Sequence, residues 1–269
     1  MAAKFSSRYF AFSGSFIHFC KNALETDTVV GYIKEQRSQY HKTFKAVLPL
    51  AAADNEGIIN FATDNIKVGA KTYTTAEFCC RIAGILAGLP LNRSATYYTL
   101  PEVESITESE TPDDDVDNGK LILINDGTKI KIARGVNSLT TTTEDKGDDF
   151  KKIKIIEAVD MIRDDIRATF EDEFVGKVEN SYDNKIVFIA AVNKYFKDLA
   201  NRGVLYDKYD NKAEIDIDET REWLSKTRDA SSWDDEKIKT ANTGTNVFMR
   251  ASIQIQDAIE DLKFGIYIE

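Results

Sequence analysis

The chain has few of the residues on which common catalytic sites depend, with two histidines and three cysteines among its 269 residues. His18 and His41 both lie in the first 41 residues, so a Ser–His or Cys–His pair has few bases available. The cysteines are Cys20, Cys79 and Cys80, and an odd number with an adjacent pair does not suit a disulfide framework. We therefore expect folding under reducing conditions, with Cys79 and Cys80 as core thiols on a closely packed helix.

Long apolar runs and dense basic patches are also missing. No run of about 18 apolar residues occurs, so we expect no membrane insertion. The formal net charge is −10, from 35 basic and 45 acidic residues, and this balance argues against nucleic acid as a partner. The short basic run of Lys151, Lys152 and Lys154 lies among acidic residues and is interpreted as a solvated face.

Motifs for cofactors and metals fail on inspection. The stretch "DDDVDNG" (113–119) is similar to a calcium loop, but Ile124 stands where a bidentate glutamate is needed. The stretch "VGAKT" (68–72) fails as a phosphate loop because Ala70 separates the glycine from the lysine. We expect no cofactor, no metal site and no catalytic residues, and we interpret the protein as not an enzyme.

The residues that are present predict a mixed helical and extended chain. Apolar residues make up 42% of it, which is enough for a full core. Helical spacing predicts helices over 27–40, 150–174 and 181–203, the last capped by Ser181 or Asp183. Residues 73–89 form a further predicted helix, with a capping box of Thr74 and Glu77 and a stop at Gly88. Thr111 and Gly119 bracket a short helix, and another is expected over 218–227.

Extended segments alternate with these helices. Short buried strands are predicted at 44–50 and 57–61, a hairpin over 120–135 around Asp126-Gly127, and a strand pair within 204–218. Residues 245–269 are extended, and one face of a final strand carries the apolar side chains Leu262, Phe264, Ile266 and Ile268. The fold class is α/β (α+β), with mixed sheets, packed helices and an extended C-terminal strand arm. We divide the chain into an atypical N-terminal segment (1–27), an α/β part (28–105) and a C-terminal domain (106–269) that includes the arm 245–269.

The octamer "RGVNSLTT" (134–141) follows the hairpin and offers no nucleophile or metal ligand. Gly135 can supply a backbone conformation that other residues resist, and Asn137 can tie down loop backbone. Arg134 can pair with a carboxylate of a neighbouring subunit or of its own chain. An ordinary polar loop after a hairpin is the plainer alternative.

Five stretches in order resemble tail sheath proteins of contractile-tailed phages and R-type bacteriocins. They are "GKLILINDGTKIKIARGVNSLTT", "NEGIIN", "AGILAGLPLNRSATYYTL", the pair "DMIRDDIRATFEDEFVGKVEN" and "AAVNKYFKDLANRGVL", and "NVFMRASIQIQDAIEDLKFGIYI". The similarity runs from about Ala23 to the end of the chain. Because such subunits are normally longer at the N-terminus, the resemblance also implies an N-terminally truncated chain.

The resemblance implies a structural subunit that polymerises around a tail tube and contracts to drive the tube through a cell envelope. The implied partners are other sheath subunits, the tail tube protein, and baseplate and tail terminator proteins. The implied location is a virion tail or bacteriocin particle, assembled in the bacterial cytoplasm. Leu262, Phe264, Ile266 and Ile268 would then form a subunit interface by strand addition.

The alternative is an α/β enzyme or small-molecule binding domain with an unrecognised site. A pocket with convergent polar groups and a perturbed carboxylate favours the enzyme. An exposed terminal strand favours the sheath.

Overall fold

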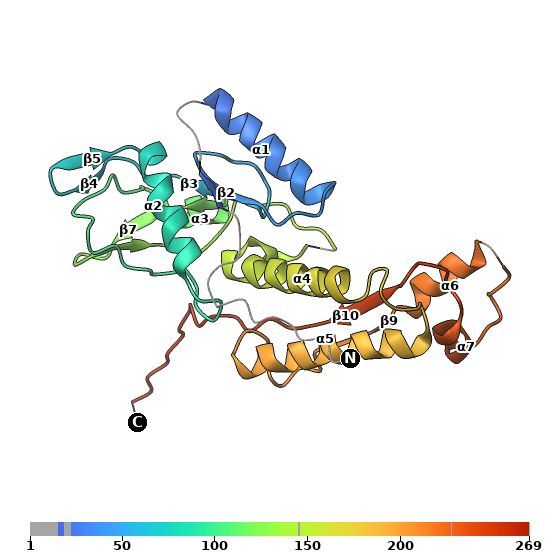
Figure 1. Ribbon diagram of the computed structural model, residues 1–269. Helices are drawn as coiled ribbons and strands as arrows, with labels where there is room; N and C mark the ends of the chain where they lie inside the picture. The colour runs from blue at the N-terminus through green and yellow to red at the C-terminus, as the bar shows by residue number, and fades with distance from the viewer. Residues whose placement is uncertain (1–15, 19–22, 145, 227, 269) are drawn as a thin grey trace. The chain divides into compact units, whose positions relative to one another are not determined.

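The computed structural model describes residues 16–18, 23–144, 146–226 and 228–268, which form two compact units (Figure 1). The larger unit comprises the described residues up to Met161 together with those from Asp257 onward, and the smaller unit is Ile162–Gln256. The boundary that we placed after residue 105 lies inside the larger unit. Most of the segment 1–27 lies outside the described residues.

A four-stranded parallel sheet is the centre of the larger unit. Its order is β1 (Phe16–His18), β2 (Lys45–Pro49), β3 (Ile58–Phe61) and β6 (Lys120–Leu121), and each neighbouring pair is parallel. Strands β2 and β3 are buried along almost their whole length. That burial explains their nearly continuous apolar sequences, because a parallel strand is covered on both faces. The predicted strands at 44–50 and 57–61 are therefore confirmed.

Helices α1 (Ala23–Ser38) and α2 (Thr75–Gly88) cover opposite faces of this sheet (Figure 1). Alternate residues of the strands serve the two sides, so that Val47 and Ile59 pack with α2 while Ala46 and Leu48 pack near Ile33 of α1. Successive side chains on a strand point to opposite faces, which gives one sheet two separate apolar clusters.

The start of α2 follows the sequence prediction. The Thr74 side chain accepts a hydrogen bond from the Glu77 backbone, and the Glu77 carboxylate accepts one from Thr74 N at 2.9 Å. The cysteine prediction is only half right. Cys79 is buried in the core, whereas Cys80 is exposed, because adjacent helical positions differ by about 100° in direction. Cys20 lies outside the described residues.

Two hairpins complete the larger unit. The predicted hairpin forms as β7 (Leu123–Asn125) and β8 (Ile130–Ile132), and the Asp126 carboxylate accepts hydrogen bonds from the backbone of Thr128 and Lys129, both at 3.0 Å. A second hairpin, β4 (Ile66–Val68) with β5 (Lys71–Tyr73), spans the stretch that we had tested only as a phosphate loop. Helix α3 (Pro112–Asp117) comes directly before β6, and a 3₁₀ turn (Asp148–Lys151) comes after the octamer.

The smaller unit is built around helix α5 (Tyr182–Asn201), whose N-cap is Ser181 rather than Asp183. Helix α4 (Ile153–Glu173) begins in the larger unit and ends in the smaller one. In the smaller unit, Phe170 and Phe174 of α4 contact Phe188 of α5 edge to face, with ring centroids 5.1 and 4.9 Å away. The apolar residues at helical spacing that predicted both helices therefore form this contact.

The prediction of a strand pair within 204–218 is wrong. Strand β9 (Lys212–Ile215) instead pairs antiparallel with β10 (Met249–Ser252), far along the sequence. The segment between these strands, residues 216–248, is called the excursion here, and it contains α6 (Ile217–Ser225) and the unpredicted α7 (Asp235–Thr240). Its two ends are joined by a hydrogen bond from Asp216 N to Phe248 O at 3.1 Å. The excursion has its own small core of Leu224, Ala230 and Ile238, packed with Ile217, Trp223, Trp233 and Ala241.

Candidate functional site

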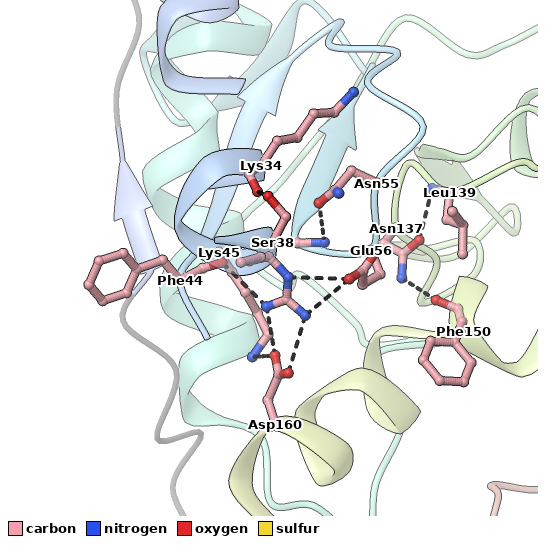
Figure 2. Close-up of polar contacts among 12 residues, drawn as sticks. Lys34, Ser38, Phe44, Lys45, Asn55, Glu56, Asn137, Leu139, Phe150 and Asp160 are labelled. Carbon is pink, nitrogen blue, oxygen red and sulfur yellow. Dashed lines mark hydrogen bonds and ion pairs between the residues drawn. The ribbon is translucent and has the colours of Figure 1, made fainter. Parts of the chain in front are cut away.

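The octamer 134–141 is a rigid loop within the larger unit. Asn137 is fully buried, and its side chain donates to Phe150 O at 2.7 Å and accepts from Leu139 N at 2.9 Å (Figure 2). Ser138 N donates to Ile58 O at 2.8 Å, which ties the loop to β3. Asn137 therefore does hold loop backbone in place, as its side-chain chemistry suggested.

Two glycines, Gly135 in the octamer and Gly119 before the hairpin, allow other residues to pack closely against the backbone. Gly135 could have supplied a backbone conformation that other residues resist, but its φ is not positive. A Cβ there would instead lie 3.3 Å from the Ala95 side chain, so this glycine permits a close approach. Gly119 does have a left-handed conformation, at φ +70°, and a Cβ there would lie 3.0 Å from Asn137 O.

The threonines of the octamer bind one carboxylate. Thr140 N and Thr141 N donate to Asp54 at 2.8 and 2.9 Å. These backbone donors hold the pKa of Asp54 well below its usual value. The hydroxyl-rich half of the octamer thus binds a turn of the same unit.

Arg134 pairs with carboxylates near the end of its own chain. Its guanidinium donates to Glu260 at 2.9 Å and also to Asp261. The hydrogen bond to Asp261 raises the pKa of Arg134, and the same contact lowers the pKa of Asp261. Of the two alternatives that we left open, the structure therefore has the intrachain pair.

The basic run beside the octamer is not simply a solvated face. Lys152 contacts Asp149 at 3.3 Å and also pairs with Asp257, while Lys154 is buried. Lys152, Asp257, Glu260 and Asp261 were absent from our predicted site. The one signal for them in the sequence is the acidic stretch "DAIED" (257–261). It does not stand out, because acidic residues are common throughout the chain.

The residues predicted as a subunit interface are exposed. Leu262, Phe264, Ile266 and Ile268 have exposed fractions of 83%, 77%, 77% and 95%. Residues 257–268 form no strand and no backbone hydrogen bond with the rest of the described chain. The predicted final strand is thus absent from this isolated chain, and its apolar side chains are uncovered.

A buried cluster of charges lies elsewhere in the larger unit. Arg37 of α1 donates to Asp160 of α4 at 2.9 Å, and Lys45 Nζ lies 2.9 Å from Asp160 (Figure 2). Lys45 Nζ also lies 3.0 Å from Glu157. The Lys45 and Glu157 side chains are only 2% exposed. Burial raises the pKa of Glu157 to about 7, against the attraction of Lys45.

A cavity of the smaller unit is lined by both apolar and polar side chains, and it contains none of the residues of this buried cluster. Its volume is about 390 Å³, and its lining includes Phe170, Phe174 and Phe188. Lys185 also lines it, is 6% exposed, and has a pKa lowered by burial. The perturbed carboxylate and the cavity therefore do not combine into one site. Among the described residues no group of three or more His, Cys, Asp or Glu side chains is placed to hold a metal ion, and no described helix is long and apolar enough to cross a membrane.

Comparison with known proteins decides the family. The phage tail sheath C-terminal domain profile matches residues 145–269. The tail sheath protein of Clostridium phage phiCD119 is 38% identical over 245 residues, which are 90% of this chain and 68% of that protein. The chain belongs to the tail sheath family. Tail sheath proteins are structural components of contractile tails, and this is the class of protein that the sequence resemblance implied.

Solved structures show the same fold. The sheath tail protein of Desulfitobacterium hafniense matches with a TM-score of 0.67 and 21% identity, over 74% of this chain and 49% of that one. The contracted helical sheath of the anti-feeding prophage matches with a TM-score of 0.59 and 12% identity, over 93% of this chain and 67% of that one. The α/β class with mixed sheets is therefore the sheath fold. The chain spans about half the length of the Desulfitobacterium protein.

Proposed function

We propose that this chain acts as a structural subunit of a contractile sheath. Such a subunit polymerises around a tail tube, and its contraction drives the tube through a cell envelope. Family membership supports this role, as does the match to the contracted helical sheath of the anti-feeding prophage. An open contact from one copy to the next generates a helical assembly rather than a closed dimer.

The observation that carries the proposal is the uncovered terminal segment, residues 262–268. It presents four large apolar side chains to water, and none of the described residues covers them. Burying each such side chain contributes roughly 1.5–3 kcal/mol, so contact with a second copy has a large driving force. Its unused backbone donors and acceptors can add a strand to a neighbouring sheet, while alternate side chains fill a groove.

The remaining partners are proposed on the same basis. A sheath subunit of this kind contacts the tail tube protein inside the sleeve, and the baseplate and tail terminator proteins at its two ends. The match to a chain in the structure of the anti-feeding prophage baseplate supports the contact with a baseplate. Assembly in the bacterial cytoplasm, and residence in a virion tail or a bacteriocin particle, follow from that role.

We also propose that the role is structural and not catalytic. The carboxylate with the raised pKa, Glu157, is paired with Lys45 in a buried cluster, so it is neutralised by the protein itself. The cavity of the smaller unit is lined by apolar side chains together with polar ones such as Glu179, Asn184 and Lys185, and Glu157 is not part of this lining. This separation favours the sheath over an α/β enzyme or small-molecule binding domain.

Deletion of residues 262–269 tests the proposal. We expect the melting temperature to change little, because these side chains contact no core, while self-association measured by sedimentation and electron microscopy of rings or tubes is lost. The matched control replaces Lys263 and Tyr267 with serine, which leaves the four apolar side chains in place. Loss of the monomer fold on deletion, or unaltered assembly without the segment, would contradict the proposed role.

A further inference from the structure

Residues 257–261, which directly precede the terminal segment, are called its root here, and they carry three carboxylates. Asp257 pairs with Lys152, and Glu260 and Asp261 both pair with Arg134. Each carboxylate of the root therefore has a cation of the larger unit as its partner. The free residues 262–268 begin directly after the last of these contacts.

Charge is the main interaction that holds the root. Ile259, its one large apolar side chain, is almost completely exposed, so apolar burial contributes little. No backbone hydrogen bond joins residues 257–268 to the rest of the described chain, and the last such bond upstream runs from Gln256 N to Val204 O at 2.8 Å. Without the ion pairs, the chain beyond Gln256 would have little to fix its direction.

The two cations are themselves held on a rigid base. Arg134 lies two residues after the end of β8 and precedes Gly135, whose N donates to Thr96 at 2.9 Å. Lys152 lies opposite Val136 in an isolated β-bridge, and Asn137 N donates to Lys151 O at 2.9 Å. The octamer therefore places the guanidinium and the ammonium at a fixed spacing, which suits the acid–x–x–acid–acid pattern of the root.

We propose that Arg134 and Lys152 are positioning residues that anchor the root, and so set the direction and reach of the free residues 262–268 toward a second copy. This inference rests on the proposed function, in which those residues bind a neighbouring subunit. A tether that starts at residue 262 confines the apolar side chains more tightly than one that starts at 257. Confinement raises their effective concentration at a neighbour's binding site.

The anchor is also releasable. The side chains of Arg134 and Lys152 are about one third exposed, so water and salt weaken their ion pairs. A segment held by such contacts stays in place in the isolated subunit, yet it can swing when a neighbour moves. The octamer thus has a role that its lack of catalytic groups had left unexplained.

The test compares the full chain with Arg134→Gln, with the charge exchange Arg134→Glu/Glu260→Arg, and with Arg250→Gln as a matched control. Arg250 also pairs with two acidic residues at the surface, Glu214 and Asp218, but none of them belongs to the root. Backbone ¹⁵N relaxation of residues 258–261 reports the anchor directly. We expect order parameters of about 0.8 in the unchanged chain and the control, and below about 0.6 in Arg134→Gln.

Self-association is measured on the same proteins at low salt. Arg134→Gln should need about 3–10-fold more protein for half-association, because the longer tether lowers the effective concentration. The charge exchange should recover much of the loss, and the difference should vanish near 1 M salt, where the Debye length is about 3 Å. Unchanged order parameters in Arg134→Gln would overturn the anchor.

A variant lacking 262–269 separates this inference from the proposed function. If that variant associates as well as the full chain, the role of the terminal segment fails, whatever Arg134 does. If its association is lost while Arg134→Gln associates normally, the segment binds a neighbour but the anchor does not set its reach. If the full chain does not associate at any concentration, the proposed function loses its support and the order parameters alone decide the anchor.

Discussion

The larger unit contains two clusters of opposite charges that use the same chemistry in different surroundings. In the buried cluster, Lys45 and Glu157 are 2% exposed, whereas in the anchor Arg134 is 32% exposed and Asp261 75%. Removing charges from water is costly, so a buried pair must stay complete, while an exposed pair contributes little to folding. The buried cluster therefore holds the sheet to α1 and α4, whereas the exposed one is suited to reversible contact.

The largest effect should come from breaking the buried cluster at Lys45. Lys45→Met leaves Glu157 and Asp160 without their shared ammonium, and we expect the free energy of unfolding to fall by about 3–5 kcal/mol. Chemical denaturation measures this loss. As a control, Lys67→Met removes a lysine from an ion pair that is half exposed on both sides, and it should cost less than about 1 kcal/mol. Equal losses in the two variants would remove the distinction between the clusters.

The buried cluster should also respond to pH. Since burial raises the pKa of Glu157 from its usual 4.5 to about 7, the folded protein keeps a proton that the unfolded chain releases between these values. The contribution of Glu157 to the free energy of unfolding therefore falls as pH rises from 4.5 to 7. Glu157→Gln removes this dependence, so the variant should gain about 1–3 kcal/mol on the wild type between pH 4.5 and 8. A difference that is constant over this range would contradict the raised pKa.

Between the two extremes lies Asn137, which is buried but uncharged. Asn137→Ala leaves Phe150 O and Leu139 N without their side-chain partners, and we expect a loss of about 1–3 kcal/mol by denaturation. Thr128→Ala, which changes an exposed side chain in the hairpin turn, is a suitable control with a smaller expected loss. A loss under 0.5 kcal/mol for Asn137→Ala would mean that the octamer is less rigid than its hydrogen bonds indicate.

The smallest effect on folding should come from the anchor. Arg134→Gln should change the free energy of unfolding by less than about 1 kcal/mol, because its pairs are partly exposed. Thermal and chemical unfolding check this value, and the same variant is expected to alter the mobility of residues 258–261. A large loss of stability would mean that Arg134 is needed for folding, and that the exposed cluster does not differ from the buried one in its role.

Local signals explain what could be predicted from the sequence. The capping box of Thr74 and Glu77, and the turn at Asp126, depend on residues within a few positions, so they could be read directly. The partner of β9 could not be predicted, because pairing with β10 depends on tertiary packing across the α6–α7 excursion. Arg134 and Glu260 are 126 positions apart, and no local pattern links them.

The terminal segment shows a different limit. Its alternating apolar residues predict a strand, but a strand needs a neighbour to pair with, and the described part of the chain offers none. Cys80 shows a third limit, because a helix rich in small residues does not reveal which of two adjacent thiols faces outward. In each case the missing information concerns what lies opposite the residue, not the residue itself.

The closure of the excursion between β9 and β10 has a consequence for how the protein can diverge. Ile215 lies opposite Met249 in the ladder, so the excursion leaves and returns at adjacent points of one small sheet. Because α6 and α7 bury their own apolar side chains around Leu224, much of this lobe is supported from within. We therefore expect that this lobe can be lengthened or shortened with little disturbance elsewhere. Foreign peptides are best inserted between the exposed residues Arg228 and Asp229, outside the small core. Far-ultraviolet circular dichroism and a melting curve of such an insertion would show whether the lobe tolerates cargo in this way.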